Sequence, residues 1–411
     1  MRVLLSTYGS RGDVEPLAAL AVALQNLGAE AVVSAPGEQE FVDLLARAGV
    51  AFAPAFMPVR QWIEEARQAP VPLPKLAAKM IPLQVEAIST AAAGCDAIVA
   101  TGLFPSVAAA HCVAEKGGLH YQTANFCPLS LPSHDHAPFP RPGYPLPPEV
   151  TDRRALWALN AEHMNALFGE AINTQRAAMD LPALDSVRDP IFTKHPLLAS
   201  DSLLWPWAAT DLCDPVQTGA WILPDNRALP AELEAFLNAG APPVYVGFGS
   251  IALQTAKDAA QLAVAAARAQ GRRVVLARGW ADAAPIDNDD DVFLIGDVNQ
   301  QRLFPRCAAI VHHGGAGTTT TAAMAGAPQV IVPQIVDQPY WAARVAGLGI
   351  GVAHDGPVAT KESLSAALEE ALEPGMKERA AGVRATMRDD GATIAARLLL
   401  DAVAVNQKRG A

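Results

Sequence analysis

The chain has 411 residues, a hydrophobic content of 51% and a formal net charge of −11 at pH 7. The length suits two or three domains, and the acidic balance without a basic run argues against nucleic acid as a partner. No apolar run reaches the length of a membrane span and no secretory leader precedes the first strand-like run, so we expect a cytoplasmic protein without stable membrane insertion. The five cysteines are scattered and odd in number, unlike a disulfide framework or a zinc site.

Short apolar runs alternate with stretches of helical periodicity in the first half of the chain. This alternation is the signature of a parallel sheet covered by helices. The rhythm loosens over 56–82, where prolines recur, and the proline-rich stretch 127–148 is expected to be a long loop or two. The expected strands are 3–7, 30–34, 50–53, 96–100 and 119–124, and the expected helices are 14–27, 38–48, 105–116 and 152–179.

The same rhythm resumes after a connector near residues 206–224. The expected strands are 243–248, 273–277, 292–295, 308–311 and 329–332, and the expected helices are 229–239, 256–270, 298–303, 320–326, 340–346, 361–372, 376–388 and 393–405. The fold class is therefore α/β, with two doubly wound, Rossmann-like halves that face each other across a cleft. We expect domains at 1–205 and 225–390, a linker at 206–224, and a C-terminal helix and tail at 391–411 that packs back toward the first domain.

One segment combines several features of a diphosphate site. An apolar run ends in His312-His313, and Gly314-Gly315-Ala316-Gly317-Thr318-Thr319 follows. Glycines allow close approach of backbone N–H groups, and a helix N-terminus favours an anion. The threonine hydroxyls and His313 can add donors. A glycine-containing turn between strand and helix is also common in α/β proteins that bind nothing there.

Four ordered motifs resemble those of bacterial GT-B-fold glycosyltransferases of family 1, of the kind that decorate glycopeptide antibiotics of the vancomycin and teicoplanin type. The motifs are GSRGDVEP at 9–16, VGFGS at 246–250, HHGGAGTT at 312–319 and DQPYWAARV at 337–345, and VQTGAWILPD at 216–225 and GVAHDGPV at 351–358 support this subgroup. The resemblance implies inverting transfer of a hexose from a nucleotide-diphosphate sugar, bound mainly by the C-terminal half, to an acceptor hydroxyl, without a metal or another cofactor.

The resemblance assigns the general base to Asp13. An inverting transfer needs a base to deprotonate the attacking hydroxyl, and Asp13 follows the first strand in the matching position. The alternative is that Asp13 caps the helix over 14–27, a role that aspartate fills well. Related enzymes often place a histidine near this point, and this turn has none.

The remaining predicted donor contacts follow strand ends of both halves. Asp337-Gln338 matches a pair that binds sugar hydroxyls and favours a donor such as glucose, although Asp337 is also placed to cap a helix. Trp280 is expected to stack on the base or to be a core residue. The full donor set is Ser10, Arg11, Gly12, Ser250, Arg278, Trp280, Val298, His313, Gly315, Ala316, Gly317, Thr318, Asp337 and Gln338.

The acceptor region is the least defined part. Phe126, His134 and His136 are the predicted acceptor contacts, with solvated loop histidines as the alternative reading of the two imidazoles. The preferred function is O-glycosylation of a hydrophobic or aromatic aglycone from a UDP- or dTDP-sugar, by a monomer or weak dimer. Alternatives are a sterol or lipid glycosyltransferase and a nucleotide-sugar-binding auxiliary protein. A nucleotide-sugar epimerase is disfavoured by the 9–13 turn and the Asp337-Gln338 pair, and a dehydrogenase by the lack of GxGxxG after the first strand.

Overall fold

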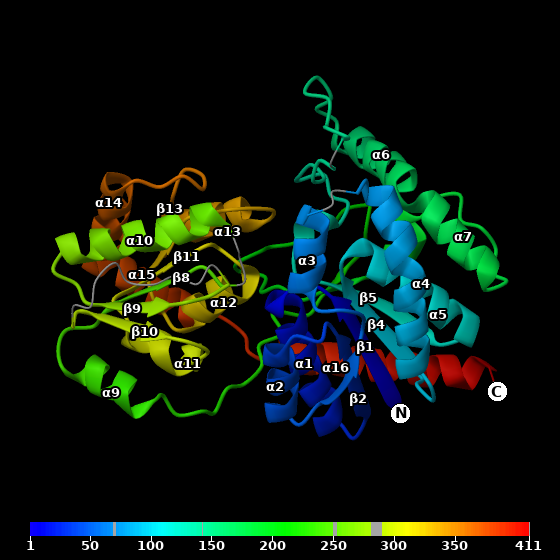
Figure 1. The fold of residues 1–411 in the computed structure, drawn as a ribbon, viewed down its shortest axis with the longest axis horizontal. Helices are drawn as coiled ribbons and strands as arrows, with labels where there is room; N and C mark the ends of the chain where they lie inside the picture. The colour runs from blue at the N-terminus through cyan, green and yellow to red at the C-terminus, as the bar shows by residue number, and fades with distance from the viewer. Residues whose placement is uncertain (69–70, 142, 250–252, 281–289, 411) are drawn as a thin grey trace. The chain divides into compact units, whose positions relative to one another are not determined.

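The computed structural model describes residues 1–68, 71–141, 143–249, 253–280 and 290–410 (Figure 1). The chain folds into two compact units, each built around its own sheet. The N-terminal unit contains residues 1–202, 206–223 and the chain from residue 389 onward. The C-terminal unit contains residues 203–205 and 224–388.

A parallel sheet of seven strands forms the middle of the N-terminal unit, in the order β3-β2-β1-β4-β5-β6-β7. The central strand β1 is buried over six of its seven residues, as expected for a strand covered on both faces. The strands are β1 Arg2–Tyr8, β2 Glu30–Ala35, β3 Ala51–Pro54, β4 Ala97–Gly102, β5 His120–Asn125, β6 Leu197–Leu198 and β7 Val216–Gln217.

The helices of this unit bury their apolar faces on the sheet. Leu4, Val32 and Ile98 share a core with α4, α5 and the segment that runs from α6 to α7. The helices are α1 Arg11–Asn26, α2 Gln39–Arg47, α3 Val59–Gln68, α4 Leu73–Ala91, α5 Phe104–Gly117, α6 Arg153–Met164, α7 Glu170–Ala178 and α8 Arg188–Phe192, with a 3-10 turn at Pro128–Ser130 and a π turn at Asn165–Gly169.

The last helix, α16 (Gly391–Gly410), also belongs to the N-terminal unit. It packs against α1, and Figure 1 shows it in red beside α1. Ala395, Leu399 and Val403 are buried. Near its end, Gln407 Nε2 donates to Asp96 Oδ1 over 2.9 Å. The first residue of α16, Gly391, packs closely against the backbone of residues 219–220. An added Cβ at Gly391 would lie 2.4 Å from the Ala220 carbonyl oxygen.

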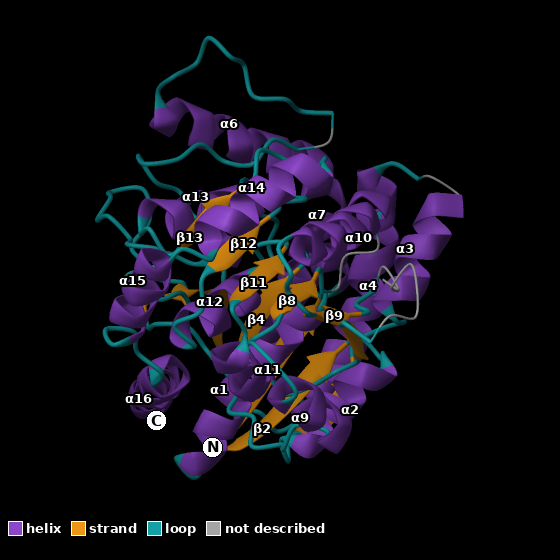
Figure 2. Cartoon of the chain, turned by 90° about the vertical axis from the view of Figure 1, so that its left-hand side faces the viewer, coloured by secondary structure: helices purple, strands orange, loops and turns teal. Residues whose placement is uncertain are grey.

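The C-terminal unit repeats the architecture with six parallel strands in the order β10-β9-β8-β11-β12-β13. Figure 2 shows β13, β12, β11, β8 and β9 side by side in this order. The strands are β8 Val244–Gly247, β9 Val274–Ala277, β10 Val292–Ile295, β11 Ala309–His312, β12 Gln329–Ile331 and β13 Gly351–Ala353.

Two separate apolar cores cover the faces of this second sheet. One joins the strands to α10 and α14, and the other joins them to α9, α11 and α12 (Figure 1). Alanines dominate the sheet-facing side of α10, so this helix approaches the strands closely. The helices are α9 Ala231–Asn238, α10 Gln254–Ala269, α11 Gln300–Leu303, α12 Ala316–Met324, α13 Gln338–Gly347, α14 Lys361–Ala371 and α15 Pro374–Arg384, with a 3-10 turn at Phe304–Arg306.

The predicted fold class is confirmed, and the structure adds local features that the sequence pattern did not show. The stretch 56–82 is largely helical, because Pro74 occupies the first turn of α4, where its missing N–H costs nothing, and Pro82 is accommodated inside the helix. The expected helix over 152–179 is confirmed as helical over 153–178, with a π turn inside it. The N-terminal sheet also gains β6 and β7, and the C-terminal sheet gains β13; these strands are too short to show a pattern. None of the helices within the described ranges is long and apolar enough to cross a membrane.

The close approach at Gly391 generates a stability prediction. Gly391→Ala should lower the free energy of unfolding by about 1–3 kcal/mol, because the new methyl group meets backbone atoms that cannot rotate away. Gly382→Ala is the control: Gly382 lies inside α15 with open space around its Cα, so alanine should raise stability by about 0.5–1 kcal/mol. Urea unfolding measures both, and equal effects would contradict the packing assigned to α16.

Candidate active site

Each sheet has one position where the strand order reverses. In the N-terminal unit it lies between β1 and β4, and in the C-terminal unit between β8 and β11. Ligands of open α/β sheets bind outside the carboxyl ends of the strands at such a switch point. The Gly9–Asp13 turn follows β1, and the His313–Gly315 turn follows β11. The two motifs thus occupy equivalent positions in the two units.

The Gly9–Asp13 turn forms the start of a helix. α1 begins at Arg11, three residues earlier than expected, with Ser10 as the N-cap. The Ser10 N–H donates to Asp13 Oδ2 over 2.8 Å, and the Gly12 N–H donates to Ser10 Oγ over 3.2 Å. Asp13 therefore lies in the first turn of α1 and accepts from the N-cap residue. It contributes to capping, as the alternative expected, but as the third residue of the helix and not as the N-cap. The carboxylate stays partly exposed.

Gly9 leaves space for the Asp13 carboxylate. An added Cβ at Gly9 would lie 2.2 Å from Asp13 Oδ2, so a larger residue there would displace the carboxylate. The Arg11 side chain pairs with Glu15 in the next turn, with 2.7 Å between Nε and Oε2. Arg11 and Asp13 are thus both held in place by their own helix.

The turn after β11 also ends in a helix that begins earlier than expected. α12 starts at Ala316, and Gly315 is its N-cap residue. The N–H groups of the first helical residues have no partner within a helix, so those of Ala316, Gly317 and Thr318 point out of the N-terminus. The Thr319 hydroxyl donates to the Gly315 carbonyl over 2.9 Å and the residue is fully buried. The expected donation from Thr319 to a ligand is therefore wrong.

His312 is a buried bridge inside the unit. Its Nδ1 accepts from the Gly314 N–H over 3.1 Å, and its Nε2 donates to Gln329 Oε1 over 2.9 Å. Gln329 Nε2 in turn donates to the Thr319 carbonyl over 3.3 Å. Burial and the neighbouring His313 lower the pKa of His312 to about 3, so the ring is neutral. The first histidine of the motif thus holds the glycine turn, and sequence reasoning missed this role.

His313 is partly exposed to solvent, whereas His312 is buried. Burial of its ring lowers the pKa of His313 to about 4, and a contact with the Gly247 backbone partly opposes this shift. The ring lies over the turn, because an added Cβ at Gly315 would lie 2.4 Å from His313 Nε2. His313 is neutral near pH 7, which favours donation of a single N–H over a positive charge.

Loops after neighbouring strands converge on the same edge. An added Cβ at Gly249, after β8, would lie 2.9 Å from His313 Cε1, and one at Gly279, after β9, would lie 2.6 Å from the Gly249 carbonyl oxygen. Both glycines have positive φ, so substitution is strained as well as obstructed. The backbone N–H of Trp280 donates to the Gly249 carbonyl over 2.9 Å. Ser250, the next predicted contact, lies outside the described residues.

The Asp337-Gln338 pair lies against the same turn. An added Cβ at Gly314 would lie 3.2 Å from the Gln338 carbonyl oxygen. Gln338 is 6% exposed, and its side-chain oxygen accepts from the N–H groups of Gln334 and Ile335 over 2.8 and 3.1 Å. Asp337 occupies the N-cap position of α13, but its side chain makes no capping bond. It accepts instead from Trp341 Nε1 over 2.7 Å.

Two further predicted donor residues lie on the adjoining edge. Arg278 follows β9, is exposed and bonds to the Ile295 carbonyl through its N–H. Val298 packs against the core under α9 and α11. Its neighbour Asn299 is 1% exposed and donates to the carbonyls of Asp225 and Arg227 over 2.7 and 2.8 Å. Asn299, which the sequence analysis did not single out, thus connects the loop 296–300 to the segment 225–227 at the start of the C-terminal unit.

The three predicted acceptor residues follow β5 in the N-terminal unit, and His134 and His136 share one loop. The Phe126 ring meets Trp221 edge-on at 5.7 Å. His134 bonds to Asp211, which also pairs with Arg154, and these two partners lower the pKa of Asp211. His136 Nε2 donates to the Leu131 carbonyl over 3.1 Å, and burial lowers its pKa. Both histidines thus hold their loop. His134 is exposed, as the alternative of a solvated loop histidine expected, whereas His136 is partly buried against Trp157 and Trp207.

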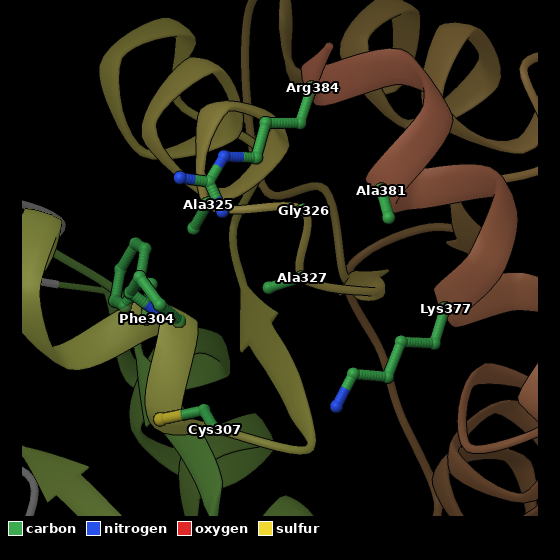
Figure 3. A pocket seen from close by; sticks show the side chains of 9 residues that line it. Phe304, Cys307, Ala325, Gly326, Ala327, Lys377, Ala381 and Arg384 are labelled. Carbon is green, nitrogen blue, oxygen red and sulfur yellow. The ribbon is translucent and has the colours of Figure 1, made fainter.

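A cavity of about 190 Å³ lies at the other edge of the C-terminal sheet. Cys307 precedes β11 and Ala327 precedes β12, so this hollow opens at the amino ends of the strands. Figure 3 shows Lys377 and Arg384 extending over it from α15. None of the predicted site residues lines it, and it is separate from the His313 edge.

The chain is similar to glycosyltransferases over its whole length. It is 52% identical to glycosyltransferase GtfE and 48% identical to the vancomycin aglycone glucosyltransferase, both from Amycolatopsis orientalis, over 98% of each chain. It is 45% identical to the dTDP-epi-vancosaminyltransferase of the same organism over 99% of each chain. The chain belongs to this glycosyltransferase family. The predicted resemblance is thereby confirmed, and the glycosyltransferase is an enzyme that transfers a sugar.

A family model and solved structures agree with this assignment. Residues 281–395 match the model described as erythromycin biosynthesis protein CIII-like, C-terminal domain. The kitacinnamycin glycotransferase superposes with a TM-score of 0.72 at 19% identity, covering 97% of this chain and 98% of the other. VinC, solved in complex with dTDP, gives 0.66 at 20% identity with full coverage of both chains. At these identities the structures establish the shared fold.

The His312 bridge generates a pH prediction. The unfolded chain binds a proton at each of these histidines below about pH 6.5, and the native chain does not until about pH 3 to 4. The free energy of unfolding should therefore fall as the pH drops from 6.5 toward 4, by up to about 1.4 kcal/mol per pH unit for each histidine. In urea unfolding of His312→Asn, the free energy of unfolding should depend less steeply on pH, because one fewer proton is taken up on unfolding. Parallel profiles would show that His312 is not held neutral.

Proposed function

We propose that this glycosyltransferase moves a hexose from a UDP- or dTDP-sugar to a hydroxyl of an aromatic, glycopeptide-like aglycone, with inversion at the anomeric carbon. The single observation that carries this proposal is the 48% identity, over 98% of both chains, to a relative named as a vancomycin aglycone glucosyltransferase. A relative named for a dTDP-sugar and the dTDP complex of VinC support a nucleotide-diphosphate donor.

In the proposed mechanism the C-terminal unit binds the donor. The N–H groups of Ala316, Gly317 and Thr318 and the helix N-terminus of α12 suit a diphosphate. His313, neutral and placed over Gly315, adds an N–H donor, and Ser250 and Arg278 are further candidates. Trp280 and Val298 are assigned to the base, and Asp337 and Gln338 to the sugar. The leaving diphosphate gains charge in the transition state, so preorganised donors at this turn lower the barrier.

The N-terminal unit supplies the acceptor site and the base. Asp13, partly exposed at the switch point of the first sheet, accepts the proton of the attacking hydroxyl as it forms the new bond to the anomeric carbon. Its hydrogen bond from the Ser10 N–H keeps the carboxylate oriented, and the positive end of α1 stabilises the ionised form. Ser10, Arg11 and Gly12 are assigned to the diphosphate, and Phe126, His134 and His136 to the acceptor. No metal or other cofactor takes part.

A donor-by-acceptor screen tests this function. Purified enzyme is incubated with UDP- and dTDP-glucose and with glycopeptide, flavonoid and sterol aglycones, and products are read by mass. The expected result is a hexose mass added to a glycopeptide aglycone, with the rate unchanged by EDTA. Product on sterols alone would replace the acceptor class, and no product with any pair would favour an auxiliary protein. NMR of the product reads the anomeric configuration and hence inversion or retention.

Asp13 can be tested with little disturbance of α1. Asp13→Asn keeps a side-chain oxygen to accept from the Ser10 N–H but loses the basic carboxylate, so the transfer rate should fall about 10²–10⁴-fold while UDP affinity persists. Glu86→Gln removes an acidic group from the exposed surface of α4 in the same unit and should leave the rate within about twofold. A transfer rate in Asp13→Asn equal to wild type would exclude Asp13 as the base.

A further inference from the structure

We infer that Trp341 is the positioning residue that orients Asp337 toward the donor sugar. This inference rests on the proposed function, because it concerns the sugar contact assigned to Asp337. The indole Nε1–H of Trp341 donates to Asp337 Oδ2 over 2.7 Å, one helical turn along α13. A hydrogen bond to an ionised acceptor is stronger than one between neutral groups, and it also fixes the plane of the carboxylate.

The Trp341 ring is itself immobilised. It is 1% exposed and meets the Trp205 ring edge-on at 5.1 Å. Trp205 also stacks on Tyr340, with 3.3 Å between ring centroids. Arg344, further along α13, donates to the carbonyls of Leu204 and Leu203 over 3.0 and 3.1 Å. The short segment 203–205 is thereby anchored to α13 and covers the ring, so the indole N–H has one direction in which to point.

The backbone that carries Asp337 is held in a shape it would not adopt alone. Val336 has a φ of 55°, which is costly for a β-branched residue. The Gln338 side-chain oxygen holds the preceding turn through the N–H groups of Gln334 and Ile335. Asp337 is therefore constrained from two sides, its backbone by Gln338 and its carboxylate by Trp341. The side-chain oxygen of Gln338 accepts these two bonds, so the side-chain amide nitrogen is the group of Gln338 that we assign to ligand contact.

This arrangement separates two ways in which a mutation can act. A carboxylate that accepts hydroxyl bonds from a sugar contributes only when the sugar is present, whereas the His313 turn contacts the diphosphate in both UDP and UDP-glucose. Loss of the Trp341 N–H should therefore weaken binding of the nucleotide sugar and spare the free nucleotide. A purely structural tryptophan would change the two affinities alike.

The test is calorimetry of Trp341→Phe with UDP-glucose and with UDP, or with the thymidine pair if the wild-type enzyme binds that pair more tightly. Phenylalanine retains an aromatic ring in the pocket but cannot donate. We expect the Kd of the nucleotide sugar to rise about tenfold and that of the free nucleotide by less than twofold. Val345→Ala is the control: it removes buried side chain from the same helix, should lower Tm, and should leave the ratio of the two constants unchanged.

A double-mutant cycle with Asp337→Ala completes the test. If Trp341 acts through Asp337, Trp341→Phe should have no further effect on the ratio in the Asp337→Ala background. Additive effects, or an unchanged ratio in the single variant, would overturn the positioning role. A wild-type enzyme that binds neither pair, or an Asp337→Ala variant with an unchanged ratio, would instead overturn the proposed function itself.

Discussion

The turn after β11, at the carboxyl ends of the strands of the C-terminal sheet, depends on one buried, neutral imidazole. His312 bridges the Gly314 N–H at the turn and the Gln329 side chain on the neighbouring strand β12, and Gln329 passes the connection to the Thr319 carbonyl inside α12. These bonds fix where the turn ends and where the helix begins. A charged ring could not fill this role, because one of its nitrogens must accept. Full burial keeps the ring neutral and therefore keeps the acceptor.

Glycine occurs at this edge wherever two loops approach most closely. Gly249, Gly279, Gly314 and Gly315 each lie so near a ring, a side chain or a neighbouring backbone that an added Cβ would come within 3 Å of it. The described residues of the loops after β8, β9, β11 and β12 consequently pack closely together around these glycines. This arrangement suits a ligand that is recognised by its charge and its oxygen atoms.

The N-terminal unit has a similar strand order, but the turn at its switch point holds a carboxylate instead of a glycine-rich backbone. Its first turn holds a carboxylate beside a helix N-terminus, with Gly9 providing the space and Ser10 the hydrogen bond. The same bonds serve the helix and the side chain, so capping and proton transfer are compatible roles for Asp13. The sugar contact proposed for Asp337 follows a similar logic. There the carboxylate is held by Trp341 of its own helix, and the segment 203–205 secures the tryptophan.

The sequence by itself determined the sheet type, most of the strands and the family. These follow from local features: apolar runs of a few residues, helical periodicity and four ordered motifs. It failed where the decisive partner is distant or the run is short. The helices in 56–82 were hidden by prolines that are harmless in a first turn, and β6 and β13 have two and three residues. Only the tertiary structure separated His312 from His313, since the difference lies in Gln329, which β12 brings beside β11. It likewise assigned Trp341 to Asp337 and Asn299 to the carbonyls of 225 and 227. A buried polar group must find a partner, and which partner it finds is decided by the packing of strands and helices, not by neighbours in the chain.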